Sequence, residues 1–153
     1  MKTFGLYEEG FLAACTINGG GTGGGSGGGG GSGREVGTTW TLCSQGFGVF
    51  YGVAYGNGLF VAVGGLGFGT ILTSPDGVSW TERTSGTYNP LSSVTYGNGT
   101  FVAVGEGGTI LTSPDGVSWT ERASPTKDFL NGVAYGNGTF VAVGKDGAIL
   151  TFP

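Results

Sequence analysis

Two copies of the segment Ser-Pro-Asp-Gly-Val-Ser-Trp hold hydroxyls, carboxylates and indoles at a repeated spacing. They cover residues 74–80 and 113–119. Hydroxyl and carboxylate oxygens two residues apart can accept hydrogen bonds from the backbone amides of a turn. Metal binding is disfavoured, because two isolated carboxylates in separate repeats cannot share one ion. We therefore expect structural turns and no metal or other cofactor. The residues expected to form these turns are Ser74, Asp76, Gly77, Trp80, Ser113, Asp115, Gly116 and Trp119.

The composition argues against several other kinds of chemistry. The chain of 153 residues has no histidine, so the usual proton shuttle and the commonest metal ligand are absent. Charged residues make up 10% of the chain and the net charge is −4, which argues against binding to nucleic acid. Cys15 and Cys43 are too few for a disulfide scaffold or a zinc site, and form either one bridge or two free thiols. No apolar run approaches the roughly 20 residues of a transmembrane helix.

A repeat of about 40 residues must position the two turns. Val53 recurs as Val94 and Val133, in steps of 41 and 39 residues, and Trp80 recurs as Trp119. Short apolar strands and glycine-rich turns at this period are typical of β-propeller blades. The sequence therefore predicts an all-β fold made of blades with four antiparallel strands each.

The second repeat divides into four expected strands. Their ranges are Val94–Tyr96, Thr100–Val104, Thr109–Thr112 and Ser118–Arg122. Asn98-Gly99 separates the first two and favours the left-handed angles of a tight hairpin. The second strand is almost entirely apolar, which suits a strand buried on both faces between neighbouring blades.

The two Ser-Pro-Asp-Gly-Val-Ser-Trp segments resemble the Asp-box (BNR) motif of sialidase-like and photosystem II assembly-factor-like propellers. That motif, roughly Ser-x-Asp-x-Gly-x-x-Trp, lies between the third and fourth strands of a blade, as these segments do. Here one residue fewer separates Asp from Gly. The resemblance implies a fold-stabilising turn at the outer rim, with the Trp in the seam between blades.

The resemblance does not bring the sialidase reaction with it. Those enzymes gather several arginines, a Tyr/Glu pair and an Asp around the propeller axis. Arg83 and Arg122 are instead expected at the rim, and no glutamate lies on the axis strands beside Tyr55, Tyr96 or Tyr135. We therefore expect no enzymatic activity, with a glycosidase-like enzyme as a distant alternative.

The chain divides into three expected segments: an N-terminal segment (1–18), a Gly/Ser-rich linker or polyglycine arm (19–33) and the propeller repeats (34–153). Within the repeats we expect blades at 53–83 and 94–122 and a partial blade at 133–152. The missing fourth strand matches residues 37–42, at the front of the repeats.

Three blades are fewer than the 4–8 of closed propellers, so we expect a homo-oligomer. Each chain would donate the strand of Trp40 to the incomplete blade of its neighbour. Two copies would supply six blades and three copies nine, and the dimer is favoured. The alternative is a fragment of a longer propeller.

Loops at one end of the blades are where the repeats diverge. They are Ser44–Tyr51, Thr84–Ser93 and Ala123–Asn131, together with Gly65–Gly69, Glu106–Gly108 and Lys145–Gly147. The candidate ligand-binding residues in and beside them are Phe47, Phe50, Tyr51, Phe68, Tyr88, Lys127, Asp128 and Phe129. Exposed aromatics with a few polar groups suit carbohydrate or protein recognition, although they also suit ordinary loop packing. The sequence thus predicts a recognition or attachment module on an extracellular, cell or virion surface, with a purely structural assembly subunit as the alternative.

Overall fold

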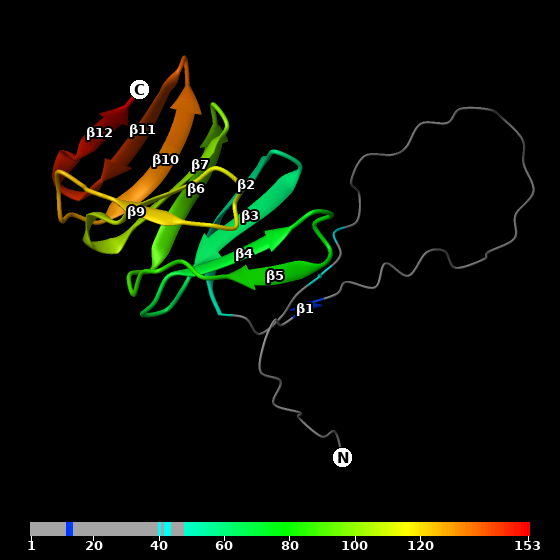
Figure 1. Cartoon of the computed structure of the whole chain (residues 1–153). Helices are drawn as coiled ribbons and strands as arrows, with labels where there is room; N and C mark the ends of the chain where they lie inside the picture. Colours follow the sequence, from blue (N-terminus) through cyan, green and yellow to red (C-terminus); the bar gives the residue numbers. More distant parts are fainter. Residues whose placement is uncertain (1–11, 14–39, 41, 44–47) are drawn as a thin grey trace, which may run out of the picture.

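The computed structural model describes residues 12–13, 40, 42–43 and 48–153, and within them the fold is all-β, without an α-helix. Three antiparallel sheets lie side by side in the order of the chain (Figure 1). The first sheet has β2 (Phe50–Gly56), β3 (Leu59–Gly64), β4 (Thr70–Ser74) and β5 (Trp80–Arg83), and β1 (Leu12–Ala13) pairs with β5. The second has β6 (Leu91–Gly97), β7 (Thr100–Gly105), β8 (Ile110–Ser113) and β9 (Thr120–Arg122). The third has β10 (Leu130–Gly136), β11 (Thr139–Gly144) and β12 (Ile149–Phe152). The predicted linker at 19–33 lies outside the described residues.

A two-residue Asn-Gly turn closes the first hairpin of every sheet. Asn57, Asn98 and Asn137 have φ angles of 49°, 45° and 49°. Each is followed by a glycine whose φ is also positive. Left-handed angles at both central positions match the twist of the strands that the turn joins, so the predicted tight hairpins are confirmed.

The first strand of each sheet begins three residues earlier than the sequence predicts, at Phe50, Leu91 and Leu130. The reason is a bulge after the first residue, where the pairing register shifts. A bulge adds one unpaired residue and lets the strand continue on both sides of it. The loops predicted before these strands are correspondingly shorter, and Phe50 and Tyr51 belong to β2 rather than to a loop.

In the second sheet, two further strands begin later than predicted, and β6, β7 and β8 each end one residue later than predicted. Strand β8 begins at Ile110 instead of Thr109, because the Thr109 amide donates to the Glu106 carbonyl in a short 3-10 turn, η1 (Glu106–Gly108). A matching turn, η2 (Lys145–Gly147), precedes β12. Strand β9 begins at Thr120 instead of Ser118, because the Val117 and Ser118 amides bind a carboxylate in the preceding turn.

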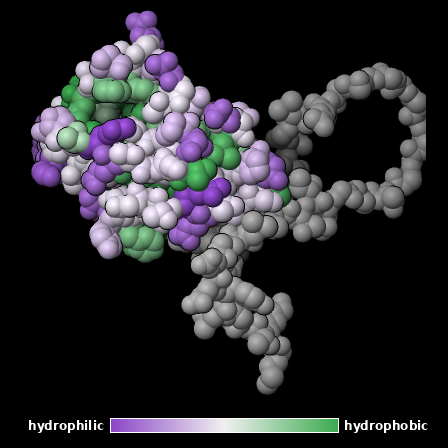
Figure 2. Space-filling view, viewed as in Figure 1, coloured by the Kyte–Doolittle hydropathy of each residue, from purple (hydrophilic) through white to green (hydrophobic). Residues whose placement is uncertain are grey.

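Each sheet has a front face, turned toward the preceding sheet along the chain, and a back face, turned toward the following one. Strand β6 lies between β2 and β10, so the first strands of the three sheets are neighbours. Polar and charged residues cover much of the visible surface, whereas apolar residues lie exposed over the third sheet (Figure 2).

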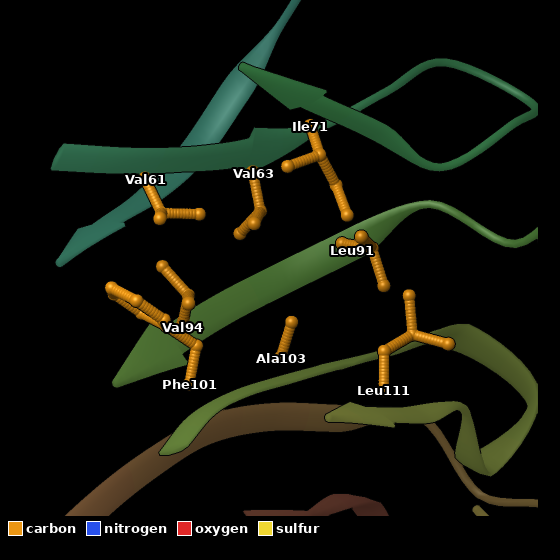
Figure 3. Close-up of a cluster of buried hydrophobic side chains, with 8 residues drawn as sticks. All are labelled: Val61, Val63, Ile71, Leu91, Val94, Phe101, Ala103 and Leu111. Atoms are coloured by element: carbon orange, nitrogen blue, oxygen red, sulfur yellow. The ribbon is translucent and has the colours of Figure 1, made fainter. Parts of the chain in front are cut away.

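The core between the first two sheets joins one back face to one front face. Val61, Val63 and Ile71 point from the first sheet toward the second, as Figure 3 shows. Their partners are Leu91, Val94, Phe101, Ala103 and Leu111. A second cluster, between the second and third sheets, contains Val102, Val104, Leu130, Phe140 and Ala142. Full burial of each large side chain in these seams is worth about 1.5–3 kcal/mol.

Candidate functional site

The two Ser-Pro-Asp-Gly turns hold their backbone through side-chain oxygens. Ser74 Oγ accepts from the Gly77 amide at 2.8 Å, and Asp76 Oδ1 accepts from the Val78 and Ser79 amides, each at 2.8 Å. Gly77 has a φ of 75°, which glycine adopts at little cost. Ser74 Oγ and Asp76 Oδ1 thus both accept hydrogen bonds from the backbone of the turn.

The turn after β8 has the same hydrogen bonds. Ser113 Oγ accepts from the Gly116 amide at 2.8 Å, and Asp115 Oδ1 accepts from the amides of Val117 and Ser118. Its Trp119 donates from Nε1 to the Gly116 carbonyl at 2.9 Å. This repetition is evidence that the sequence of the turn, rather than its surroundings, determines its shape.

Trp119 lies in the seam between the first two sheets, as predicted. Its ring centroid is 6.4 Å from that of Phe101, and it packs against the first core cluster. A Cβ built on Gly116 would approach Leu59 of the first sheet to 2.9 Å, so the turn itself also packs across the seam. Trp80 keeps the equivalent hydrogen bond, to the Gly77 carbonyl at 3.2 Å.

The electrostatics of the two carboxylates follow from these hydrogen bonds. The Ser79 amide, then the Val78 amide and the Ser74 hydroxyl, hold the pKa of Asp76 below its ordinary value of 3.8. The Ser118 and Val117 amides do the same to the pKa of Asp115. Across the described residues, no group of three or more His, Cys, Asp or Glu side chains could hold a metal ion. The turns therefore have the character of structural elements.

A cavity of about 570 Å³ opens where the first strands of the three sheets begin. Tyr51, Ser92 and Asn131 occupy equivalent positions at the three bulges, and all three line it. A bulge redirects the side chain of its extra residue, which explains why three separate strands converge here. The remaining lining residues are Gly65, Leu66, Gly67, Pro90, Leu91, Glu106 and Phe129.

Polar contacts fix part of this cavity wall. The Ser92 hydroxyl donates to the Val104 carbonyl at 3.1 Å and contacts the Leu130 carbonyl, which connects the second sheet to the third. Lys145 Nζ lies 5.7 Å from the centroid of the Phe129 ring, within the range of a cation–π contact. Glu106 is exposed at the rim and is the one charged side chain among the lining residues.

The structure brings the predicted binding residues together in two groups. Tyr51 and Phe129 share the cavity just described. Phe68 and Tyr88 line another hollow, of about 600 Å³, beside the loop that follows β5.

Of the other four predicted residues, the three that the structure describes line neither cavity. Phe50 is half-buried in β2 and Lys127 is exposed. Asp128 Oδ2 accepts a hydrogen bond from the Thr126 hydroxyl at 2.6 Å. Phe47 lies outside the described residues.

Sequence reasoning missed Ser92, Glu106 and Asn131 as cavity residues. A signal was present in the repeat itself. Position 51 reads Tyr, and its equivalents 92 and 131 read Ser and Asn, although two positions later all three repeats have valine. Residues that differ between repeats, two positions before a valine that all three share, are side chains that the common core does not constrain.

Arg83 and Arg122 do not line the cavity of Tyr51, Ser92 and Asn131, although Arg83 lines the hollow of Phe68 and Tyr88. Arg83 Nε donates to the Thr73 hydroxyl at 2.9 Å, and Arg122 Nε donates to the Thr112 hydroxyl at 2.8 Å. Each contact ties an outermost strand of the repeat, β5 or β9, to its neighbour.

The described part of the chain contains no helix long and apolar enough to cross a membrane. No protein-family model matches the chain, and no curated protein matches it.

Proposed function

We propose that the chain is a non-catalytic recognition module that binds carbohydrate at the loop end of Asp-box propeller blades. The convergence of Tyr51, Ser92 and Asn131 on one cavity carries this proposal. Their positions are equivalent in the three sheets, but their chemistry differs. A shared scaffold thus presents one aromatic ring, one hydroxyl and one amide to a single ligand.

The size and lining of the cavity favour a small polar ligand. Its volume of about 570 Å³ falls within the roughly 300–1,000 Å³ typical of ligand sites. Tyr51 and Phe129 offer flat apolar surfaces that suit the C–H face of a sugar ring. Ser92, Asn131 and Glu106 offer hydrogen-bonding groups for sugar hydroxyls.

Binding without turnover fits the charges of the site. Hydrolysis of a glycoside usually needs two carboxyl groups, about 5–10 Å apart. Among the described residues that line the cavity, Glu106 is the one carboxylate. The turn carboxylates of Asp76 and Asp115 are occupied by backbone amides.

We infer in addition that the three sheets are blades of a ring that further copies complete. The sheets follow one another with their first strands adjacent, as blades do around an axis. The third sheet has three strands where the others have a fourth from the same repeat. Two copies would make six blades, within the usual range.

Glycan-array binding tests the recognition proposal. We expect wild-type protein to bind a defined set of glycans, and Tyr51→Ala and Asn131→Ala to reduce that binding by tenfold or more. Tyr88→Ala is the matched control, because Tyr88 is 88% exposed and lines the other hollow, and it should bind as wild type does. Native mass should be measured for every variant, so that loss of assembly is not read as loss of a contact.

Two outcomes would contradict carbohydrate recognition at this cavity. One is a blank array with correctly assembled protein, which would favour the purely structural subunit. The other is glycan binding that Tyr51→Ala and Asn131→Ala leave unchanged while Tyr88→Ala removes it. The exposed apolar faces of the first and third sheets are the observation that keeps the structural subunit as the second candidate.

A further inference from the structure

We propose that copies of this chain associate head to tail, with the front face of the first sheet of one copy on the back face of the third sheet of another. In the same contact, Trp40 of the first copy enters a cavity of the second copy that lies between its second and third sheets. This interface rests on the propeller proposal above and specifies the residues that form it. The argument comes from the two sheet-to-sheet seams that the chain already contains.

A tyrosine on a glycine is the first element of the repeated seam. Tyr96 covers Gly56 so closely that a Cβ on that glycine would be 2.0 Å from the ring. Tyr135 covers Gly97 in the same way, at 2.1 Å. At the two ends of the chain this pair is incomplete in the part that the structure describes: the third sheet has a glycine that no tyrosine covers, and the first sheet has a tyrosine that covers no glycine. Among the described residues, nothing lies within 4 Å of a Cβ on Gly136, and Tyr55, the equivalent of Tyr96 and Tyr135, is 59% exposed.

The valines on the back faces are also buried in an internal seam and exposed at the end of the series of sheets. Val61 and Val63 are 0% exposed beneath the second sheet. Their third-sheet equivalents, Val141 and Val143, are 36% and 44% exposed, and Ile149 beside them is 71% exposed. The front face of the first sheet is likewise uncovered, since its Val53 is 63% exposed. The two open faces therefore have the residue pattern of the two faces that meet in each internal seam.

A cavity of about 720 Å³ between the second and third sheets has no tryptophan among its lining residues, whereas the seam between the first two sheets has one. Between the first two sheets, Trp119 packs 6.4 Å from Phe101. The equivalent of Phe101 in the third sheet is Phe140, which lines the cavity together with Ile110 and Leu150. Among the described residues, no fourth strand pairs with β12 to bring a tryptophan there. Trp40, at the repeat position of Trp119, is 97% exposed.

The chain length between Trp40 and β2 allows both contacts at once. Trp80 precedes Val94 by 14 residues and Trp119 precedes Val133 by 14, and in each case the tryptophan belongs to the sheet that the valine packs against. Trp40 precedes Val53 by 13 residues. A copy whose β2 packs on a neighbouring third sheet can therefore place Trp40 on that same sheet, as the internal repeats do.

Native mass of two interface variants tests the proposal. We expect wild-type protein to have the mass of a closed ring, two or three chains. Gly136→Leu should reduce the mass to that of one chain, because the leucine would fill the place where Tyr55 of the other copy packs. Among the described residues of its own chain, nothing lies close enough to obstruct the leucine. Tyr55→Ala should weaken assembly by tenfold or more in dissociation constant. Glu121→Leu, which adds an apolar side chain on the exposed edge strand β9 but on the face opposite to the cavity that Trp40 enters, should leave the mass unchanged.

Mixing the two variants distinguishes a head-to-tail contact from a symmetric one. Gly136→Leu retains a competent first sheet, and Tyr55→Ala retains a competent third sheet. An equimolar mixture should therefore form a heterodimer through one good interface. In the wild type, assembly should also shift the Trp40 emission to shorter wavelength, measured as the difference from Trp40→Phe at rising concentration.

Three results would overturn the interface. They are a wild-type monomer up to millimolar concentration, an oligomer that neither variant disturbs, and a mixture that stays monomeric although each variant is folded by circular dichroism. None of these measurements involves glycan. A blank glycan array with a positive mass result would therefore reject recognition alone, and the reverse would reject the interface alone.

Discussion

At the scale of single residues, the chain uses carboxylates and hydroxyls to fold its turns. Asp115 and Ser113 share the amides between β8 and β9, and Asp76 and Ser74 repeat the arrangement in the first sheet. The carboxylates are exposed, yet each has two amide donors that the unfolded chain does not offer. Such charge-assisted hydrogen bonds favour the ionised form, which connects the turn to pH.

This connection predicts acid sensitivity. Because the folded-state pKa of Asp76 and Asp115 lies below the unfolded value, their stabilisation is present above the unfolded pKa and is lost as pH falls through the folded pKa. We expect Asp76→Asn/Asp115→Asn to be less stable than wild type at pH 7 and to depend less on pH between about 5 and 3. Urea unfolding across this range measures both effects, and parallel curves for the two proteins would contradict the prediction.

At the scale of elements, the seams between sheets depend on close approach of a ring to the backbone. Gly56 and Gly97 have no side chain, so Tyr96 and Tyr135 can lie directly on the preceding strand. The same tyrosines pack on a phenylalanine of their own sheet, at 4.6 Å between centroids. One tyrosine ring thus packs within its own hairpin and also sets the distance to the preceding sheet.

A methyl group at Gly97 should therefore separate the second and third sheets. Gly97→Ala places its Cβ about 2.1 Å from Tyr135 Cγ, and the ring must move. We expect the free energy of unfolding to fall by about 1–3 kcal/mol, as for other overpacked cores. Gly136→Ala is the matched control at the open third-sheet position, and it should change the stability of the dissociated chain by less than about 0.5 kcal/mol. Equal losses in the two variants would show that strand propensity, and not the ring, sets the effect.

The sequence was sufficient for those elements whose cause is local. Asn-Gly dipeptides produced the hairpin turns, and the Ser-Pro-Asp-Gly segments produced their hydrogen bonds wherever they occurred. The all-β fold followed from the alternation of short apolar strands and turns.

The remaining features depend on residues far apart in the sequence. The bulges extend β2, β6 and β10 toward the preceding loop, and their cause lies in the pairing with the next strand. The cavity formed by Tyr51, Ser92 and Asn131 was predicted only in part: divergence of the repeat marks these positions, but their convergence depends on the bulges and the order of the sheets together. Four of the aromatics selected from the diverging loops were consequently divided between two hollows, Tyr51 and Phe129 in one and Phe68 and Tyr88 in the other.

At the scale of the whole molecule, the chain has two internal seams and two faces at which the series of sheets stops. The seams bury the side chains that make the core, from Val61 to Ala142. The outer faces leave Val53, Tyr55 and Ile149 more than half exposed. An all-β chain with such faces gains stability from any further copy that covers them, by the same burial that stabilises its own seams.

Stability should therefore depend on protein concentration. If folded dimers unfold to separate chains, each tenfold rise in concentration favours the folded state by about 1.4 kcal/mol per dimer. We expect the thermal midpoint of wild type to rise steadily over a hundredfold range of concentration. The midpoint of Gly136→Leu should stay constant and lie below that of wild type at every concentration, because its third-sheet face remains uncovered. A wild-type midpoint independent of concentration, with a mass of one chain, would mean that the three sheets are stable with their outer faces in water.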